Sequence, residues 1–336
     1  MKMKEPFLSI IIPIYNGLNN GLPKCLDSIW EQSLDKQFYE VICVDDCSTD
    51  DTRQWLKKES ERHSNLHIIE NDKNIRQGGS RNKGVIAAKG KYIIFIDQDD
   101  YYHNESITQV YNHLRNSDLE ILIVDCAYQY PGVESNKLQH NFPHREVMTG
   151  DEQIEKNSIP YAPWKFIFLR SLMVDNELFF AENERIEDVD WVHILTHHAK
   201  RTQYQPILFI HYNKTAVSTT MTSYKSPVTV YSTLRVGKRL VELTDTTFKE
   251  SNENVKRYIR QLGARMYYIG IRSYFFFYSN IKEKSDNIKK TAKDIESNSL
   301  IIRAAKRFPK AFSIASNIIY PFGKVGMFLY RIIKYR

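Results

Sequence analysis

The sequence predicts an α/β protein with a mostly parallel sheet and flanking helices, followed by a mainly helical C-terminal region. Two observations lead to this prediction. In the first third of the chain, short apolar runs alternate with segments of helical spacing, and this alternation is typical of right-handed strand–helix–strand units. From about Ser226 onward, the apolar residues recur mostly at helical spacing, which predicts helices there.

Four strands are expected in the first hundred residues, because four short runs are rich in β-branched residues, as buried parallel strands are. They span residues 8–14, 40–45, 66–70 and 92–96. Helical spacing predicts helices between them, at 22–32, 51–60 and 79–89. We expect Ser48 or Thr49 to cap the second of these helices, and Gly90 to end the third in a left-handed conformation.

Beyond residue 100, helices and strands are predicted from the same kind of apolar spacing, which is less regular there. A helix after Ile107 precedes an apolar strand at 120–125, and residues 129–163 are polar and poorly periodic, which indicates loops and short elements. A helix at 186–200 and a strand at 207–212 complete this part. We therefore place a domain boundary near residue 222.

Composition bounds the class of protein. The chain has 336 residues, 42% of them hydrophobic, and a net charge of +7, so it has enough apolar residues for a large core and suits an anionic partner. No nucleic-acid recognition motif is present, and we expect no nucleic-acid partner. The four cysteines form no Cys-x-x-Cys pair, which favours reduced thiols in a cytoplasmic protein. No run of 18 uninterrupted apolar residues exists, so no membrane-spanning helix is expected.

Two predicted strands end in clustered acids: Asp45 and Asp46 in one case, Asp97, Asp99 and Asp100 in the other. Ligands of open parallel sheets bind beyond the carboxyl ends of the strands, so both clusters should face one crevice. Neighbouring carboxylates repel one another unless a cation compensates them, and Mg²⁺ or Mn²⁺ shared with phosphates suits that purpose. A turn or cap needs only one carboxylate, so the three acids of the second cluster favour a metal.

A third acidic cluster, Glu187, Asp188 and Asp190, enters a predicted helix. Acids in a first helical turn are stabilised by the helix dipole, which would make the cluster structural. A carboxylate there could equally serve as a general base. Spacing alone does not choose between the two interpretations.

Five segments in order resemble glycosyltransferase family 2, the inverting enzymes of GT-A fold. They are Ser-Ile-Ile-Ile-Pro-Ile-Tyr-Asn at 9–16, Cys-Leu-Asp-Ser-Ile at 25–29, Asp-Asp-Cys-Ser-Thr-Asp-Asp-Thr at 45–52, Gly-Ser-Arg-Asn-Lys-Gly at 79–84 and the Asp-x-Asp motif at 97–99. Pro163-Trp164 and Glu187-Asp188 resemble later, acceptor-side motifs. The resemblance is specific over residues 9–100, loose over 160–222 and nearly absent beyond.

The resemblance implies a GT-A catalytic domain at 1–222, with a Rossmann-like nucleotide-sugar-binding half at 1–110 and an acceptor-side half at 111–222, before a helical region at 223–336. It implies transfer of one sugar, with inversion, from a UDP-sugar to a hydroxyl of a glycan or lipid-linked glycan in bacterial surface polysaccharide synthesis. The Gln-x-x-Arg-Trp motif of processive polymerases is absent. The alternatives are transfer of another activated group, such as a polyol phosphate, and a catalytically silent nucleotide-sugar-binding subunit.

The resemblance also assigns roles to single residues. The nucleotide-sugar would be bound by Pro13, Tyr15, Asn16, Asp46, Arg81, Asp97 and Gln98. Asp46 would contact the base edge, and Asp99 together with Asp97 would ligate Mn²⁺ or Mg²⁺. His211, after a predicted strand, is a further candidate metal ligand. Asp188 would be the general base, with Trp164 and Glu187 on the acceptor side.

The segment 300–336 contains eight Lys or Arg residues and no acid, interspersed with apolar residues. Short basic pieces with apolar faces bind the interface of anionic bilayers. We therefore predict peripheral attachment to the cytoplasmic face of the cell membrane. The alternative is a helical cap on the catalytic domain whose charges are solvated.

Overall fold

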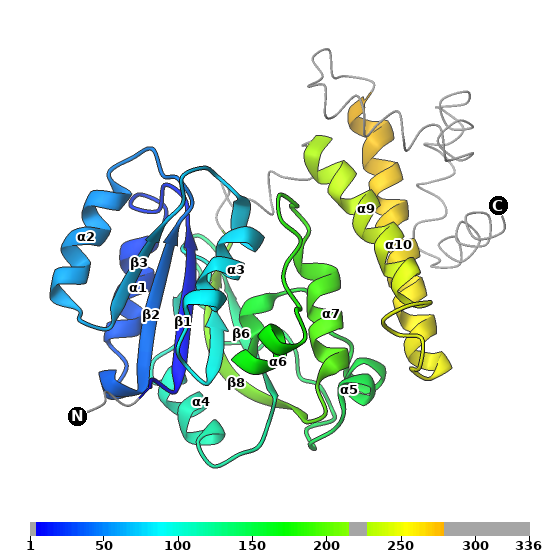
Figure 1. Ribbon diagram of the computed structural model, residues 1–336, viewed down its shortest axis with the longest axis horizontal. Helices are drawn as coiled ribbons and strands as arrows, with labels where there is room; N and C mark the ends of the chain where they lie inside the picture. Colours follow the sequence, from blue (N-terminus) through cyan, green and yellow to red (C-terminus); the bar gives the residue numbers. More distant parts are fainter. Residues whose placement is uncertain (1–4, 215–226, 279–336) are drawn as a thin grey trace. The chain divides into compact units, whose positions relative to one another are not determined.

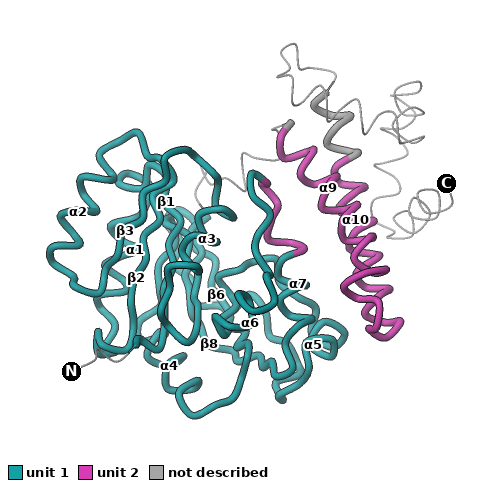
Figure 2. Tube along the Cα trace, viewed as in Figure 1, with its two compact units in different colours: residues 1–183, 191–215 teal, residues 184–190, 216–336 magenta. Residues whose placement is uncertain are grey.

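The computed structural model describes residues 5–214 and 227–278 (Figure 1). The chain divides into unit 1, Met1–Asn183 with Trp191–Thr215, and unit 2, Glu184–Asp190 with Ala216–Arg336 (Figure 2). The boundary expected near residue 222 and the basic segment 300–336 lie outside the described residues.

Unit 1 contains an eight-stranded sheet in the order β3-β2-β1-β4-β7-β6-β8-β5. The strands are β1 (Leu8–Ile14), β2 (Tyr39–Asp45), β3 (Leu66–Glu70), β4 (Tyr92–Phe95), β5 (Tyr101–Tyr102), β6 (Ile121–Gln129), β7 (Phe166–Leu169) and β8 (Thr202–Asn213). The first four run parallel, and β7 is inserted antiparallel between β4 and β6. The carboxyl ends of β1, β2, β3 and β4 therefore share one edge.

Helices cover both faces of this sheet (Figure 1). They are α1 (Leu22–Trp30), α2 (Thr52–Arg62), α3 (Arg76–Ala87), α4 (Ser106–Leu114), α5 (Gly150–Asn157), α6 (Arg170–Asp175) and α7 (Asp188–His198), with 3₁₀ turns at Lys36–Phe38 and Pro163–Lys165. Helix α3 packs on β1 and β2. It leads from β3 back across the sheet to β4, which pairs with the other side of β1. The end of β2 and the end of β4 thus lie on either side of β1, with α3 between them in sequence.

The predicted strands and helices of the first hundred residues are confirmed, and β1 and β3 have the expected bounds. All residues of β1, β2 and β4 are buried, as the continuous apolar runs indicated. Strands β5 and β7 were not expected, because two and four residues are too few to show a periodic pattern.

Two predicted caps are wrong. Helix α3 ends with extended Ala88, and Gly90 does not have a positive φ. Gly90 is instead required because β1 passes close by: a Cβ there would lie 2.5 Å from Ser9 Oγ and 2.6 Å from its backbone nitrogen. Helix α2 is preceded by Asp51, with no side-chain cap, because the Ser48 hydroxyl accepts the Asn16 N–H at 2.9 Å and so holds the end of β1.

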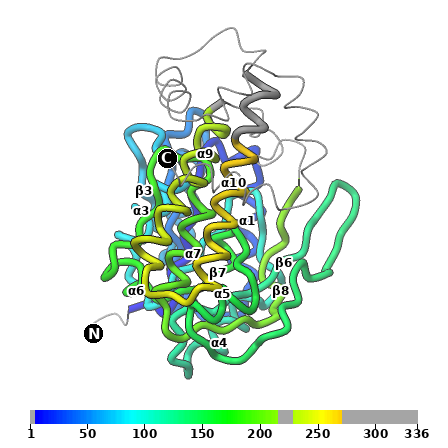
Figure 3. The backbone as a smooth tube through the Cα atoms, turned by 90° about the vertical axis from the view of Figure 1, so that its right-hand side faces the viewer, coloured from blue at the N-terminus to red at the C-terminus, as the bar shows by residue number. Residues whose placement is uncertain are grey.

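Unit 2 contains the antiparallel helices α9 (Pro227–Leu243) and α10 (Glu253–Tyr278), which lie side by side in Figure 3. Gly237 permits their close approach, since a Cβ there would lie 2.5 Å from the backbone nitrogen of Tyr267. None of the helices in the described ranges is both long and apolar enough to cross a membrane.

Candidate functional site

The loops after β1, β2 and β3 each contain a non-glycine residue in the left-handed conformation: Asn16 (φ 50°), Cys47 (φ 65°) and Arg76 (φ 66°). Such conformations cost about 1–3 kcal/mol each and tend to gather at functional sites, where surrounding contacts hold them. The edge formed by the carboxyl ends of these strands is therefore a candidate binding site.

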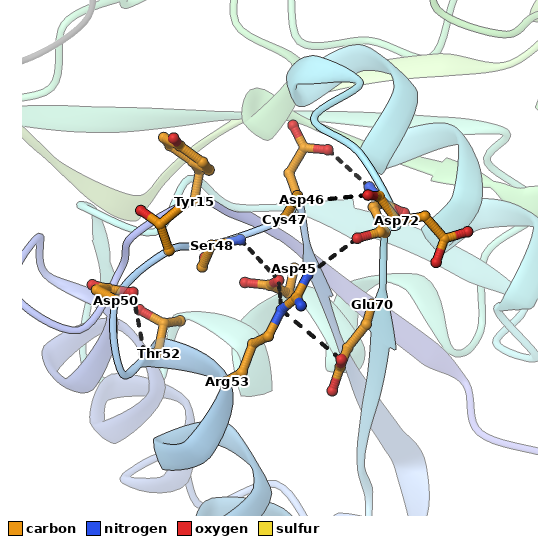
Figure 4. Close-up of polar contacts among 12 residues, drawn as sticks. Tyr15, Asp45, Asp46, Cys47, Ser48, Asp50, Thr52, Arg53, Glu70 and Asp72 are labelled. Carbon is orange, nitrogen blue, oxygen red and sulfur yellow. Dashed lines mark hydrogen bonds and ion pairs between the residues drawn. The ribbon is translucent and has the colours of Figure 1, made fainter.

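Asp46, directly after β2 (Figure 4), is buried, and its side chain accepts three hydrogen bonds. The donors are the backbone N–H groups of Ile75 and Arg76, both at 2.8 Å, and Asn71 Nδ2 at 2.9 Å. These bonds fix the start of α3 and the left-handed Arg76. A carboxylate can accept about four hydrogen bonds. Asp46 could therefore accept one more hydrogen bond, from the edge of a nucleotide base.

The neighbouring Asp45 is fully buried and serves the scaffold. Arg53 Nε donates to its Oδ2 at 2.6 Å, and the Ser48 N–H donates to the same oxygen at 3.1 Å (Figure 4). The charge that compensates Asp45 is therefore a guanidinium from α2. The first acidic cluster is held together by protein groups and does not call for a metal.

Helix α3, fixed at its start by Asp46, also carries Arg81. This guanidinium is buried against the rings of Phe95 and Phe180, at 5.8 and 5.5 Å from their centres. Its Nη2 donates to Asp97 Oδ1 at 2.7 Å. Arg81 thus positions Asp97 and neutralises one of the three carboxylates that follow β4.

Within the described part of the chain, the other two carboxylates, Asp99 and Asp100, form no ion pair with a cation. Burial, followed by the charge of Asp97, raises the pKa of Asp99 to about 6. Burial and the charges of Asp99 and Asp97 raise the pKa of Asp100 well above its usual range. Asp100 Oδ1 accepts the Asn213 N–H at 2.8 Å, whereas Oδ2 is buried without a hydrogen-bond partner in the described part of the chain.

This cluster fits a divalent cation, because a cation would stabilise the charged forms of Asp99 and Asp100 and offset their repulsion. Within residues 5–214 and 227–278, no three His, Cys, Asp or Glu side chains form a complete ligand set. The protein would therefore supply one or two carboxylates, and phosphate oxygens and water would complete the coordination, as is usual for Mg²⁺.

Gln98, the central residue of the Asp-x-Asp motif, joins this cluster to the end of β1. Its Oε1 accepts the Tyr15 N–H at 2.9 Å, and its Nε2 donates to the Tyr15 carbonyl at 3.0 Å. Both polar atoms are thus used within the protein. The Tyr15 side chain is 46% exposed and available to a ligand, whereas Pro13 is a buried residue of β1 opposite Val44.

Asn16 also serves the scaffold, because its Oδ1 accepts the Thr49 N–H at 2.8 Å. His211 is engaged at both ring nitrogens: Gln129 Nε2 donates to Nδ1 at 2.6 Å, and Nε2 bonds to His103 Nδ1 at 3.0 Å. Burial and the nearby His103 and Lys24 lower the pKa of His211 to about 4. A metal could reach His211 only if one of these hydrogen bonds broke.

Trp164, predicted on the acceptor side, is 7% exposed. Its ring stacks on that of Tyr212, with the two ring centres 5.5 Å apart. The next residue, Lys165, is buried, and its Nζ donates to Asp125 Oδ1 at 2.7 Å. Burial alone would raise the pKa of Asp125, but the bond to His140 and the Lys165 ammonium lower it to about 2. The sequence did not predict this buried ion pair. The one feature that points to it is an Asp within an apolar strand.

In unit 2, Glu187 and Asp190 are buried and Asp188, the first residue of α7, is partly exposed. Asp190 is paired with Arg239 of α9. Glu184, just before this cluster, forms an ion pair with Arg235 of α9 at 2.7 Å. Helix α9 therefore holds the segment 184–190 at several points, and Asp188 is the most accessible acid of the third cluster.

The sheet order, with an Asp-x-Asp motif directly after β4, is typical of glycosyltransferases of GT-A fold. The family model described as glycosyl transferase family 2 matches residues 9–177. The chain belongs to this family.

Two relatives illustrate where the similarity lies. The poly(ribitol-phosphate) β-glucosyltransferase of Bacillus spizizenii is 38% identical over 175 residues, which cover 52% of this chain and 26% of the relative. The poly(ribitol-phosphate) β-N-acetylglucosaminyltransferase TarS of Staphylococcus aureus is 28% identical over 176 residues, or 52% of this chain and 29% of TarS. The matched stretch thus spans less than a third of either relative.

Solved structures confirm the GT-A fold. S. aureus TarS 1–349 in complex with UDP-GlcNAc superposes with a TM-score of 0.61 at 21% identity, covering 89% of this chain and 83% of that one. The mannosyltransferase PcManGT of Pyrobaculum calidifontis, solved with GDP-Man and Mn²⁺, gives a TM-score of 0.53 at 13% identity, with coverages of 96% and 88%.

The raised pKa of Asp99 makes a prediction about stability. Between about pH 4 and 6 the folded protein binds a proton at Asp99 that the unfolded chain has already released, so the charged carboxylate lowers stability above pH 6. In EDTA at pH 8, Asp99→Asn should raise the free energy of unfolding by about 1–3 kcal/mol. The gain should shrink as the pH falls from 6 toward 4. Urea unfolding at several pH values measures this.

Asp118→Asn is the control, since it removes one carboxylate from a side chain that is 74% exposed and paired with Arg201 at the surface. Adding Mn²⁺ and UDP should make the wild type more stable than the Asp99→Asn variant, because only the carboxylate gains from a cation. A gain that is the same at pH 4 and pH 8 would contradict the raised pKa.

Proposed function

We propose that this chain is an inverting glycosyltransferase that moves one sugar from a UDP-sugar to a hydroxyl of a glycan or polyol-phosphate polymer, free or lipid-linked. The observation that carries the proposal is the uncompensated carboxylate cluster after β4, Asp99 and Asp100, at the strand edge where ligands of parallel sheets bind. The names of two relatives, which act on poly(ribitol-phosphate), and the UDP-GlcNAc complex of TarS support this donor and acceptor class.

In this proposal the donor lies over the carboxyl edge of β1, β2 and β4. Tyr15 offers an exposed ring to the nucleotide, Asp46 offers its remaining acceptor position to the base, and Asp97, held by Arg81, faces the ribose. Asp99 would hold Mn²⁺ or Mg²⁺, and the cation, when bound, would supply Lewis-acid stabilisation of the departing diphosphate.

Asp188 takes the proton from the acceptor hydroxyl as that oxygen attacks the anomeric carbon. The new bond forms on the face opposite the leaving diphosphate, so one displacement inverts the configuration and no covalent sugar–enzyme intermediate is needed. The partial exposure of Asp188, next to buried Glu187 and Asp190, supports its choice as the base. Trp164 and Glu187 then serve to shape the acceptor side.

The rival proposals keep the same fold. A silent binding subunit would not need Asp97, Asp99 and Asp188 together, and all three acids are present. Transfer of a polyol phosphate would leave a nucleoside monophosphate, whereas sugar transfer leaves UDP. Analysis of the nucleotide product with labelled donors separates the two reactions.

Asp188→Asn tests the assignment of the base. The amide keeps the shape of the side chain and removes its basicity, so turnover should fall by about 10²–10⁴. UDP affinity should stay within about twofold, because the residue is assigned to chemistry and not to donor binding. UDP release and calorimetric UDP binding are the two measurements. Glu182→Gln, at a nearby exposed acid, is the control, and near-normal turnover of the Asp188 variant would move the base elsewhere.

Arg239→Gln tests whether α9 positions this base. It leaves Asp190 buried without its guanidinium partner, which should displace the segment 184–190 and reduce turnover by about tenfold or more at unchanged UDP affinity. Arg239→Lys keeps the charge and should restore part of the rate. Lys238→Gln, on the same helix and 70% exposed, should leave turnover unchanged. If Arg239→Gln and Arg239→Lys reduced turnover equally, or if neither reduced it, positioning through this ion pair would be ruled out.

The proposal includes attachment to an anionic membrane surface through the basic segment 300–336, on the evidence of its sequence alone. The full chain should sediment with vesicles that contain phosphatidylglycerol, more strongly at low salt than at high salt. A chain ending at Ser299 should not, because it lacks eight cations. Equal binding by the two chains, or equal binding to neutral vesicles, would exclude this role.

A further inference from the structure

A hollow lies in unit 1, at the edge of the sheet opposite the carboxylates. Its volume is about 600 Å³, and it is open to solvent. Its residues include Phe7, Phe38 and Lys91, which directly precede β1, β2 and β4. These strands run parallel, so their starts form the opposite edge from Asp46 and Asp97. Strand β1 has seven residues, which at the usual rise separates the two edges by about 23 Å.

The hollow is lined by four cations, Lys89, Lys91, Arg115 and Arg170, and one acid, Glu5. Within residues 5–214 and 227–278, none of the four cations forms an ion pair with an acid. Most charged groups on a protein surface lie among both signs, whereas cations gathered around a concavity raise the local positive potential and attract anions. The charge of the hollow therefore selects for an anionic ligand.

Three of these cations are held in place without neutralisation. The Lys91 ammonium lies 5.8 Å from the centre of the Phe7 ring and 5.2 Å from that of Tyr92. The Arg115 guanidinium lies 6.0 Å from the Tyr111 ring. Arg170 Nε donates to the Val85 carbonyl, near the end of α3, at 3.1 Å. Ordering these side chains before a ligand arrives reduces the entropy that binding would cost.

The rings of Phe7, Phe38 and Tyr111 give the same hollow an apolar surface. Aromatic faces suit the carbon faces of sugars and polyols, and the four cations suit several negative charges more than one. The volume also exceeds what a single phosphate would fill. These features together favour a chain in which phosphates alternate with carbon-rich units.

We propose that this hollow is a second binding site, which takes phosphate groups of an extended phosphodiester polymer with its sugar or polyol carbons against the aromatic rings. This deepens the proposed function, on which it rests for the nature of the polymer: the acceptor chain is held at one edge of the sheet while a hydroxyl of it is used at the other.

The test measures binding of a labelled ribitol-phosphate oligomer of many repeats to the full chain, with UDP and Mn²⁺ saturating the donor site. Lys91→Gln combined with Arg115→Gln should weaken oligomer binding by about tenfold, with a shallower dependence on salt. Lys58→Gln combined with Lys200→Gln removes the same charge from two exposed positions elsewhere and should change affinity less than twofold. Matching urea unfolding midpoints check that both double variants are folded.

UDP affinity of the Lys91/Arg115 double variant should equal that of the wild type, because the donor site is at the other edge. Failure of the proposed function would appear as absent sugar transfer in the wild type, which this binding experiment does not measure. Equal oligomer affinity of the wild type and the double variant would overturn the inference. So would a double variant that binds the oligomer normally but loses binding to phosphatidylglycerol vesicles, since the hollow would then belong to a membrane surface.

Discussion

One buried carboxylate, Asp46, joins four segments at the carboxyl edge of the sheet. Its backbone N–H bonds to Ile14 at the end of β1, and its side chain accepts hydrogen bonds from Asn71 after β3 and from Ile75 and Arg76 at the start of α3. Without these acceptors, the buried N–H of Ile75 would be unpaired, at a cost of about 1–3 kcal/mol, and the part-buried N–H of Arg76 would lose its partner. The left-handed backbone of Arg76 would also lose its support. The placement of α3 depends on this one side chain.

Through α3 the same carboxylate determines the geometry at β4. Arg81 is carried by α3 and bonds to Asp97, so the position of the Asp-x-Asp motif follows from the way the helix is anchored. Gln98 makes a second connection, to the backbone of Tyr15 at the end of β1. The motif is thus rigidly held while Asp99 and Asp100 remain uncompensated. Carboxylates that the fold already holds in place would lose little entropy on binding the proposed cation.

The sequence predicted those features that depend on local pattern. Strand β1 is a continuous apolar run, and its bounds were predicted correctly, whereas β7 is four residues long and pairs with strands far away in sequence. Gly90 was misinterpreted because a glycine after a helix can serve either a left-handed turn or a close contact, and only the path of β1 decides. The carboxylates were found from their positions after strands. Other contacts join segments that are far apart in the sequence, and residue spacing cannot predict them. They are the hydrogen bonds of Asp46, the hydrogen bonds of His211 and the ion pair of Asp190 with Arg239.

The ion pairs of α9 with Glu184 and Asp190 place the segment 184–190 with the C-terminal helices, although the family model ends at residue 177. When segments are exchanged between related proteins, the two partners of such an ion pair must be exchanged together. A hybrid joined between residues 190 and 227 would combine the acids of one protein with the helix of another, and buried charges would meet neutral or like-charged neighbours. A joint before residue 184 keeps the pairs intact. A piece of chain that begins before Glu184 and includes α9 therefore keeps both ion pairs together.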